Sequence, residues 1–400
     1  MHAARYHRRL SGGLGTPGTR RLMRPTLRDV ARHAGVSVGT ASNVVTGRRG
    51  VGAQARARVE AAIAELGYRP DPAGRALIAR RHVMGRGVDP DRPRLTCVGY
   101  LCADLMARVD VLPHRDDRAM ARTIERFLGG RAANVAATAA GLGAPLPVTA
   151  EVLTVLGWDA ESDWAVEAMR TAGVAVHPSS RVQGKRLSRC LILVEASGHR
   201  TIVNEPLQVA PAVFTAWLEE LTAAGPPHGL YLQADQLDAL WPHLPELAAR
   251  GLVLATHLAV DDVHRLGTER IDALAGRADL LVLGTAAARV LVGADGGRAH
   301  LVAALAERFE GARAAVVLTL GVEGAVWLEA GAVVAEATAP AIAAVDTTGA
   351  GDTFTGCLLA ARLHRVDPAR ALRVAVAAAS QSVATAGAQT HRLTAAAIGF

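Results

Sequence analysis

Residues 346–352 read Asp-Thr-Thr-Gly-Ala-Gly-Asp, and this heptapeptide says more about the fold than any other stretch. It follows an apolar run, Ala341 to Val345, which predicts a buried strand, and it precedes residues 354–363, which predict a helix. A glycine-rich turn between a strand and a helix exposes backbone N–H groups at the helix N-terminus, where phosphate oxygens bind readily. The heptapeptide therefore predicts a phosphate site in an α/β protein.

The last residue of the heptapeptide, Asp352, would lie in the first helical turn beside the bound phosphate. A carboxylate cannot help to bind an anion, so its position favours a role as the base for an incoming hydroxyl group. The plainer alternative is that Asp352 only caps the helix, because Asp is stable at helix N-termini in any protein.

A second glycine-rich stretch, Gly129-Gly130-Arg131-Ala132-Ala133-Asn134, stands well upstream of the first. Together the two stretches resemble the paired signatures of the ribokinase-like (PfkB) carbohydrate kinases. Minor similarities follow in the same order at Leu95 to Asp104, Gly157 to Asp159 and Leu318 to Gly324. Two signatures with minor motifs in the family's order are more specific than a single glycine pattern, and the resemblance covers roughly residues 95–395.

This resemblance implies an α/β ribokinase-like fold with a small β lid, built from residues 107–111 and part of 117–128. The sequence pattern agrees, because short apolar runs alternate with helical stretches, which predicts a mostly parallel sheet flanked by helices. The strands are predicted at residues 191–194, 229–232, 252–255, 280–283 and 315–320. The helices are predicted at residues 164–172, 212–223, 265–275 and 301–309.

The resemblance also implies in-line transfer of the γ-phosphoryl group of ATP to a sugar hydroxyl, with Mg²⁺ at the phosphates. Asp352 would take the hydroxyl proton. The amides of Gly349, Ala350 and Gly351 would stabilise charge on the transferring group.

Polar side chains upstream would hold the sugar in this scheme. The resemblance gives this role to Asp104, Gly130 and Asn134, because an Asp or Asn in a desolvated pocket fixes a hydroxyl and rejects analogues that lack it. The residues that would shape the nucleotide pocket are Gly321, Gly324 and Thr348.

The family usually has Asn-x-x-Glu after the strand predicted at 280–283, where it organises Mg²⁺ and its waters. This chain has Gly284-Thr285-Ala286-Ala287 there, so the ion would rely on ATP phosphates, water and other acids. A P-loop kinase is excluded, because the single lysine of the chain, Lys185, is followed by Arg186 rather than Ser or Thr.

The N-terminal part predicts three short helices. Thr26 to Asp29 fits a capping box that opens the first helix, and Gly35 would end it. Ser37 is a good N-cap for the second helix, and residues 55–66 place apolar side chains on one face of a third. Two short helices joined by a glycine-containing turn form a helix-turn-helix.

The segment from about residue 24 to 81 resembles the DNA-binding head of LacI-type repressors, including its hinge. The resemblance rests on Asp29-Val30-Ala31, on Ala34-Gly35-Val36-Ser37 and on Leu66-Gly67-Tyr68-Arg69-Pro70. It implies a second helix in the major groove and a leucine wedge in the minor groove of a double-stranded operator. The positions that would contact DNA are Val38, Gly39 and Asn43 at the bases, Thr40 and Ser42 at phosphates, and Leu77 in the minor groove.

The alternative for this head is an ordinary three-helix bundle, and the charge distribution argues against it. Residues 20–81 carry a net charge of +9 and residues 1–19 carry +3, whereas residues 82–400 carry −5. A basic head on an acidic body favours nucleic-acid contact. A general preference for Arg over Lys does not explain why the charge collects at one end.

The remaining composition indicates a cytoplasmic protein. No uninterrupted apolar run approaches about 18 residues, which excludes a membrane span, and no apolar segment of a signal peptide follows the first arginines. The cysteines do not form a C-x-x-C pair or a zinc-like cluster with histidine, so buried thiols without a metal site are expected. The cysteines are Cys97, Cys102, Cys190 and Cys357.

The expected organisation is a disordered tail (1–22), a DNA-binding head with its hinge (23–81), a linker (82–94) and a kinase domain (95–400). Three functions remain open. The chain is a sugar kinase with a working DNA-binding head, a regulator whose kinase-like body only senses a ligand, or a metabolic kinase with a vestigial head. A homodimer is expected, because LacI-type heads read two half-sites and ribokinase-like bodies often pair through their lids.

Overall fold

The computed structural model describes residues 25–45, 51–68, 91–196, 199–221, 227–293, 296–385, 387 and 393–400. The chain forms two compact units, Met1–Asp71 and Pro72–Phe400. The predicted tail 1–22, the hinge residue Leu77 and most of the predicted linker 82–94 lie outside the described residues. Among the helices that are described, none is long and apolar enough to cross a membrane.

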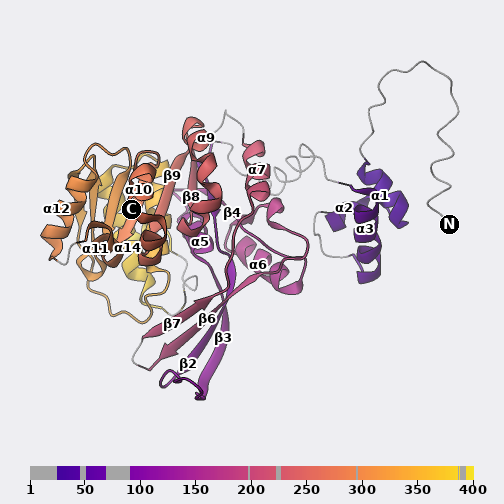
Figure 1. The fold of residues 1–400 in the computed structure, drawn as a ribbon, viewed down its shortest axis with the longest axis horizontal. Helices are drawn as coiled ribbons and strands as arrows, with labels where there is room; N and C mark the ends of the chain where they lie inside the picture. Colours follow the sequence, from indigo (N-terminus) through magenta and orange to yellow (C-terminus); the bar gives the residue numbers. More distant parts are fainter. Residues whose placement is uncertain are drawn as a thin grey trace. The chain divides into compact units, whose positions relative to one another are not determined.

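The first unit contains the three helices predicted from sequence (Figure 1). They are α1 (Leu27–Ala34), α2 (Val38–Val45) and α3 (Ala53–Leu66). The backbone N–H of Thr26 donates to the Asp29 carboxylate at 2.9 Å, which confirms the predicted start of α1. The Ser37 hydroxyl accepts from the N–H of Thr40 at 3.0 Å, which confirms the start of α2. Gly35 ends α1 in a left-handed conformation with φ of 62°.

The second unit is built on a nine-stranded sheet with the order β13-β12-β11-β10-β9-β8-β1-β4-β5. Its strands are β1 (Arg94–Val98), β4 (Thr149–Leu153), β5 (Ala175–Val176), β8 (His228–Leu232), β9 (Val253–Leu258), β10 (Leu280–Gly284), β11 (Ala315–Thr319), β12 (Ala325–Glu329) and β13 (Ala332–Ala337). Strands β12 and β13 are antiparallel additions to an otherwise parallel sheet. Most residues of these strands are buried and apolar, as expected for a sheet covered on both faces.

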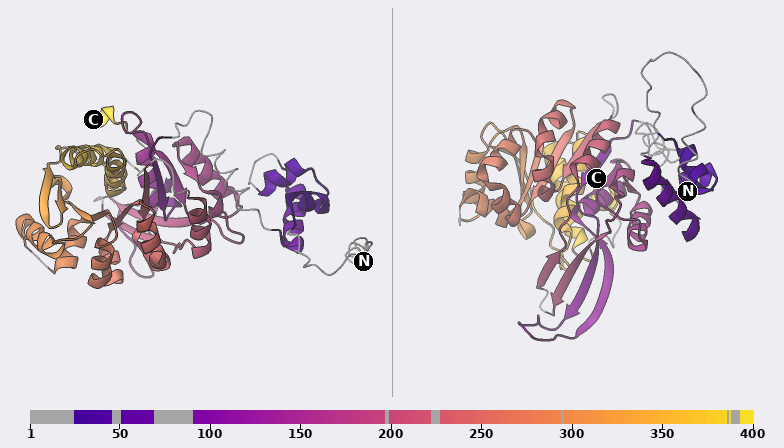
Figure 2. Two further views of the ribbon diagram at one scale, coloured as in Figure 1. Left: turned by 90° about the horizontal axis from the view of Figure 1, so that it is seen from above. Right: turned by 45° about the vertical axis from the view of Figure 1, so that its right-hand side comes forward.

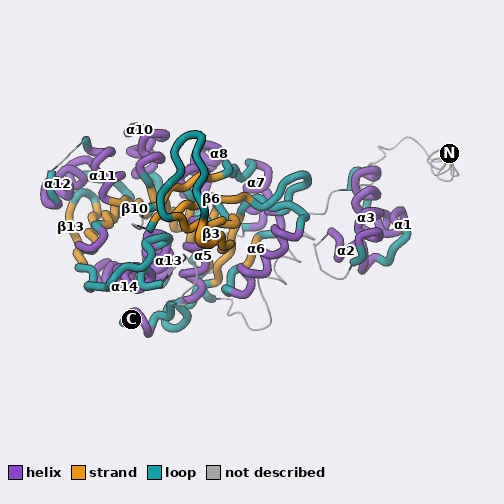
Figure 3. Tube along the Cα trace, turned by 90° about the horizontal axis from the view of Figure 1, so that it is seen from below, coloured by secondary structure: helices purple, strands orange, loops and turns teal. Residues whose placement is uncertain are grey.

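Helices cover both faces of this sheet, with α13 and α14 on one side and α8 and α10 on the other (Figures 2 and 3). The helices are α5 (Arg131–Gly141), α6 (Ala160–Thr171), α7 (Pro211–Glu220), α8 (Leu237–Leu240), α9 (Leu244–Ala249), α10 (Val260–Ala275), α11 (Thr285–Val292), α12 (Arg298–Arg308), α13 (Ala350–Leu363) and α14 (Pro368–Ser382). Short 3₁₀ turns are η3 (Pro178–Ser180), η4 (Ala234–Gln236), η5 (Trp241–His243), η6 (Gly321–Glu323) and η7 (Ala396–Ile398). The two layers enclose two separate apolar cores, which confirms the predicted α/β fold.

A second, four-stranded sheet projects from the body as the lid (Figure 2). Its strands are β2 (Cys102–Val109), β3 (Ala121–Gly129), β6 (Ser188–Glu195) and β7 (Arg200–Asn204), in the order β3-β2-β6-β7. The predicted lid segments 107–111 and 117–128 fall in or beside β2 and β3, but the lid also contains β6 and β7. The prediction that residues 191–194 form a strand of the main sheet was wrong, because this apolar run pairs with β2 of the lid.

The predicted buried strand at Ala341 to Val345 was also wrong. This segment is irregular and exposed, and 68% of the Val345 surface is accessible. Strand β13 already closes the edge of the sheet at Ala337, so the chain leaves the sheet before the apolar run begins. The N–H groups of Val345 and Asp346 instead donate to the carbonyl of Val383 after α14. The predicted phosphate turn is thus approached from a surface loop.

Candidate active site and DNA-binding face

The predicted phosphate turn forms the N-terminus of α13. Gly349 is its N-cap, with a left-handed φ of 76° that favours glycine. A side chain at Gly351 would come within 2.8 Å of the His257 ring, and one at Gly356 within 2.5 Å of the Val135 carbonyl. Glycine at these positions lets α13 approach β9 and α5 closely. The first N–H groups of α13 have no partner within the helix, as a phosphate site requires.

Asp352 lies in the first turn of α13 and is only 8% exposed. The side-chain amide of Asn134, on α5, donates to one carboxylate oxygen at 2.8 Å. The guanidinium of Arg131 lies 3.9 Å from the other oxygen. The two glycine-rich stretches, more than two hundred residues apart in sequence, therefore meet at Asp352.

The environment of Asp352 sets its protonation. Burial raises the pKa of the Asp352 carboxyl above its ordinary value, while the charge of Arg131 and the hydrogen bond from Asn134 lower it. These opposing effects suit a general base, which must be ionised before the reaction and must accept a proton during it.

Arg131 is itself anchored by groups that sequence reasoning did not identify. Its guanidinium donates to the backbone carbonyl of His257 at 3.0 Å and approaches the Asp262 carboxylate at 3.5 Å. His257 is the penultimate residue of strand β9, and burial lowers its pKa to about 3, so its ring is neutral. A single arginine thus ties β9, α10 and the candidate base together. In the sequence, Arg131 stood out only as a member of the second glycine-rich stretch.

Asp104 reaches the same site from strand β2 of the lid. Its carboxylate lies directly against Gly129, where any side chain would overlap it. Gly130 has a φ of 105°, and a side chain there would overlap the Tyr100 carbonyl. The two glycines of the second signature therefore create the space in which Asp104 and the start of α5 come together.

Asp104 is largely shielded from water. Burial raises its pKa to about 6, and the Cys102 thiol donates to one carboxylate oxygen at 3.1 Å. The negative charge of Asp352 adds to this rise in pKa. The hydroxyl groups of a ligand would supply further hydrogen-bond donors to both carboxylates.

The residues predicted for the nucleotide lie in two places. Gly321 and Gly324 form the η6 turn between β11 and β12, and a side chain at Gly324 would overlap the Ala337 carbonyl. The Thr348 hydroxyl accepts a hydrogen bond from Arg200 of the lid at 2.9 Å. Thr348 therefore faces the lid, and the structure shows no contact between it and η6 among the described residues.

The end of strand β10 carries no ligand for a metal ion. Gly284 caps α11, and the Thr285 hydroxyl donates to the Thr319 carbonyl at 3.0 Å. Within the described part of the chain, no three His, Cys, Asp or Glu side chains are arranged to hold a metal. These residues do not fit a protein-held Mg²⁺, so the ion would have to arrive with the phosphates of ATP.

Helix α2 of the head divides cleanly between a buried and an exposed face. Ala41 and Val44 pack into the core of the head with Val30 and Val59. Val38 is 45% exposed despite its apolar side chain, and Gly39 beside it is exposed. The other three positions predicted to contact DNA on this helix are half-buried, namely Thr40, Ser42 and Asn43.

Comparison with known proteins agrees with this geometry. The profile of the pfkB family carbohydrate kinases matches residues 92–395. The chain belongs to this family. Ribokinase of Arabidopsis thaliana is 27% identical over 313 residues, which span 75% of this chain and 79% of that protein. The solved structure of Arabidopsis thaliana ribokinase complexed with ribose and ATP covers 77% of this chain and 97% of that one, with a TM-score of 0.62 and 22% identity.

The head of this pfkB family member matches a different group. The profile of the bacterial regulatory proteins of the lacI family matches residues 26–71. The HTH-type transcriptional regulator CelR of Thermobifida fusca is 49% identical over 61 residues, which span 15% of this chain and 18% of that protein. The chain thus joins a LacI-type DNA-binding domain to a ribokinase-like kinase domain.

We predict that replacing Arg131 changes the pH dependence of any reaction that needs ionised Asp352. Arg131→Gln removes the charge that lowers the Asp352 pKa. On acidification, the variant should therefore lose activity at a higher pH than the wild-type protein does. Arg131→Lys, which keeps the charge, should preserve the wild-type midpoint. The measurement is kcat/KM against pH. An unchanged acid limb in Arg131→Gln would show that Arg131 does not act on Asp352.

Proposed function

We propose that this protein is an ATP-dependent sugar kinase whose head binds a specific DNA operator, and that it regulates transcription in the cytoplasm in connection with a sugar. The observation that carries the catalytic part is the buried Asp352 between Asn134 and Arg131 at the N-terminus of α13. A buried polar cluster of this kind in an otherwise apolar layer is typical of a functional site.

The reaction follows from the positions of these groups. A sugar held by Asp104, Asn134 and the backbone at Gly130 presents one hydroxyl to Asp352, which takes its proton. The hydroxyl oxygen forms a bond to the γ-phosphorus of ATP, and the bond from that phosphorus to the ADP oxygen breaks. The amides of Gly349, Ala350 and Gly351 receive the charge of the transferring group.

ATP would approach from the side of the η6 turn. Support comes from Gly321, which has open space where a side chain would stand, and from Val322, an apolar residue that is 92% exposed. A nucleotide base lying on this turn would cover Val322. Mg²⁺ would be carried by the phosphates and would neutralise part of their charge.

The second candidate is a regulator whose kinase-like body senses a sugar or nucleotide without turning it over. The residues Gly284 to Ala287 favour it, because they lack the amide and carboxylate that organise Mg²⁺ in the family. A metabolic kinase with an inactive head is the third.

ADP release with Mg-ATP across pentoses, hexoses and nucleosides separates these functions. We predict sugar-dependent turnover that falls by about 10²- to 10⁴-fold in Asp352→Asn, because the variant cannot accept the proton. Asp261→Asn, an exposed carboxylate at the start of α10, should retain full activity. Binding of a sugar by calorimetry without turnover of any acceptor would instead establish the sensor.

The head would place α2 in the major groove with Val38, Gly39 and Asn43 at base edges. An amide at residue 43 pairs best with adenine. Thr40 and Ser42 would contact phosphates and set the register. The exposed Val38 supports this arrangement, because a thymine methyl group would cover its apolar surface.

We propose that the protein is a homodimer formed through the outer face of the lid. Cross-strand pairing places Leu105, Leu191 and Val203 on one face, with Ile124 on the same face of β3. Leu191, Val203 and Ile124 are 52%, 59% and 72% exposed. We propose a second copy of the chain as the partner that covers this face, because a LacI-type head reads two half-sites in register and DNA binding therefore needs two heads.

We predict that a double variant Ile124→Asp, Leu191→Asp is a monomer and binds selected operator DNA about 10²-fold more weakly, since the two heads are no longer linked. Val322→Asp is the control, since it places an acidic side chain at an exposed apolar position outside the lid. Light scattering and fluorescence anisotropy measure the two effects. A double variant that remains dimeric would exclude this interface.

A further inference from the structure

A cavity of about 490 Å³ lies between the lid and the loop that leads into α13. All four lid strands and the loop after residue 343 contribute to its walls. Its lining residues are Met106, Arg108, Val109, Arg122, Val194, Glu195, Ala196, His199, Arg200 and Ala344 to Thr348. None of the roles assigned above to the sugar, the transferring phosphoryl group or the DNA requires this cavity.

The charge of the cavity is positive. Arg108, Arg122 and Arg200 line it, and its two acids are Glu195 and Asp346. The two acids already accept from backbone N–H groups, Glu195 from Leu112 at 3.3 Å and Asp346 from Thr348 at 2.8 Å. The cavity therefore offers more hydrogen-bond donors than acceptors.

The arginines are only partly neutralised by carboxylates. Arg108 lies 4.0 Å from Glu125, at the limit of an ion pair. Arg200 lies 3.8 Å from Asp346 and otherwise donates to the neutral hydroxyls of Thr347 and Thr348. Arg122 forms an ion pair with Asp110 at the exposed end of the lid. An anion in the cavity would find Arg108 and Arg200 available for charged hydrogen bonds.

The cavity continues the walls of the sugar site. On β2, alternate residues share one face, so Met106 and Arg108 follow Asp104 on the same side of the lid. On the opposite wall, Thr347 and Thr348 run directly into the turn that carries Asp352. A molecule that contacts Asp104 and Asp352 with its sugar ring would therefore extend into the cavity with its far end.

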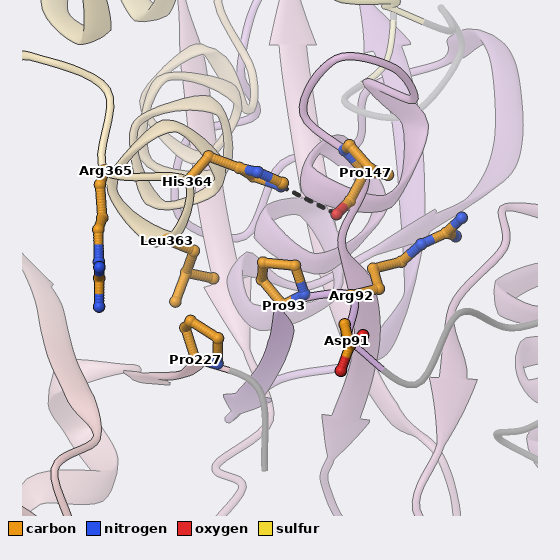
Figure 4. A pocket seen from close by; sticks show the side chains of 8 residues that line it. All are labelled: Asp91, Arg92, Pro93, Pro147, Pro227, Leu363, His364 and Arg365. Carbon is orange, nitrogen blue, oxygen red and sulfur yellow. Dashed lines mark hydrogen bonds between the residues drawn. The ribbon is translucent and has the colours of Figure 1, made fainter.

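A second cavity, of about 430 Å³, lacks this arrangement of basic side chains (Figure 4). It lies where β1 begins, and it also has basic residues in its wall. There His364 donates to the Pro147 carbonyl at 3.0 Å, and the side chains of Arg92 and Arg365 point in different directions. It lies at the C-terminus of α13, whose partial negative charge disfavours an anion.

We propose, building on the kinase function above, that the cavity under the lid receives an anionic group of the acceptor. The acceptor is then a sugar that already carries a phosphate or carboxylate group, remote from the hydroxyl that Asp352 deprotonates. Arg108 and Arg200 hold this group, and they select the acceptor by its charge.

The test compares anionic sugars with their neutral parents in the full-length protein. We expect wild-type protein to prefer the anionic acceptor. Arg108→Gln and Arg200→Gln should each reduce kcat/KM for it by roughly 10- to 100-fold, as for loss of a charged hydrogen bond. Turnover of the neutral parent by Arg108→Gln should change by no more than about twofold. Arg115→Gln is the matched control, since it removes an exposed arginine of the lid turn outside the cavity.

A preference for neutral sugars that survives in both variants would overturn the proposal while leaving the kinase function intact. Calorimetry without ATP keeps the test independent of turnover, because affinity for a phosphorylated sugar should fall in Arg108→Gln even if no acceptor is phosphorylated. Inorganic phosphate alone binding as tightly as the phosphorylated sugar would show that the cavity takes a free anion, and it would overturn the assignment to the acceptor.

Discussion

The carboxylate of Asp352 is buried in a layer that is otherwise apolar, and the organisation of the active site depends on how that charge is held. A buried carboxylate without partners would be protonated or would destabilise the fold. Asn134 and Arg131 prevent this, and both come from the start of α5. The N-termini of α5 and α13 are thereby held together, and their partial positive charges face the same site.

The glycines around this contact have structural reasons as well as chemical ones. Gly129 and Gly130 give room to the Asp104 carboxylate and the Tyr100 carbonyl, while Gly351 gives room to the His257 ring. The glycines of the two signatures in this chain are thus required by close packing between four elements. The predicted phosphate site lies where these elements meet. Residues Gly284 to Ala287 after β10 lie outside this packing, so the absence of an amide and a carboxylate there does not disturb Asp352 or its partners.

The sequence predicted the residues of the candidate site that lie within recognisable motifs. It gave no signal for residues that reach the site through contacts between distant parts of the chain. Asp352, Asn134 and Asp104 were predicted because each lies within a recognisable stretch. Arg200 contacts Thr348 from 148 residues away, and nothing in its own neighbourhood signals this. The apolar run Ala341 to Val345 resembled a strand, but composition does not show whether a sheet has an open edge to receive it. The run at 191–194 was recognised as a strand and assigned to the wrong sheet for the same reason.

The central claim is that Asp352 is an ionised base at neutral pH despite its burial. NMR titration of protein with ¹³C-labelled aspartate carboxyl groups tests this most directly, with Asp352→Asn to assign the signal. The account predicts a single transition below neutral pH, although burial raises the pKa of Asp352 above its ordinary value and Arg131 and Asn134 only partly oppose this rise. A carboxyl group that stays protonated through neutral pH would contradict it, since Asp352 could not then take a proton from a sugar hydroxyl.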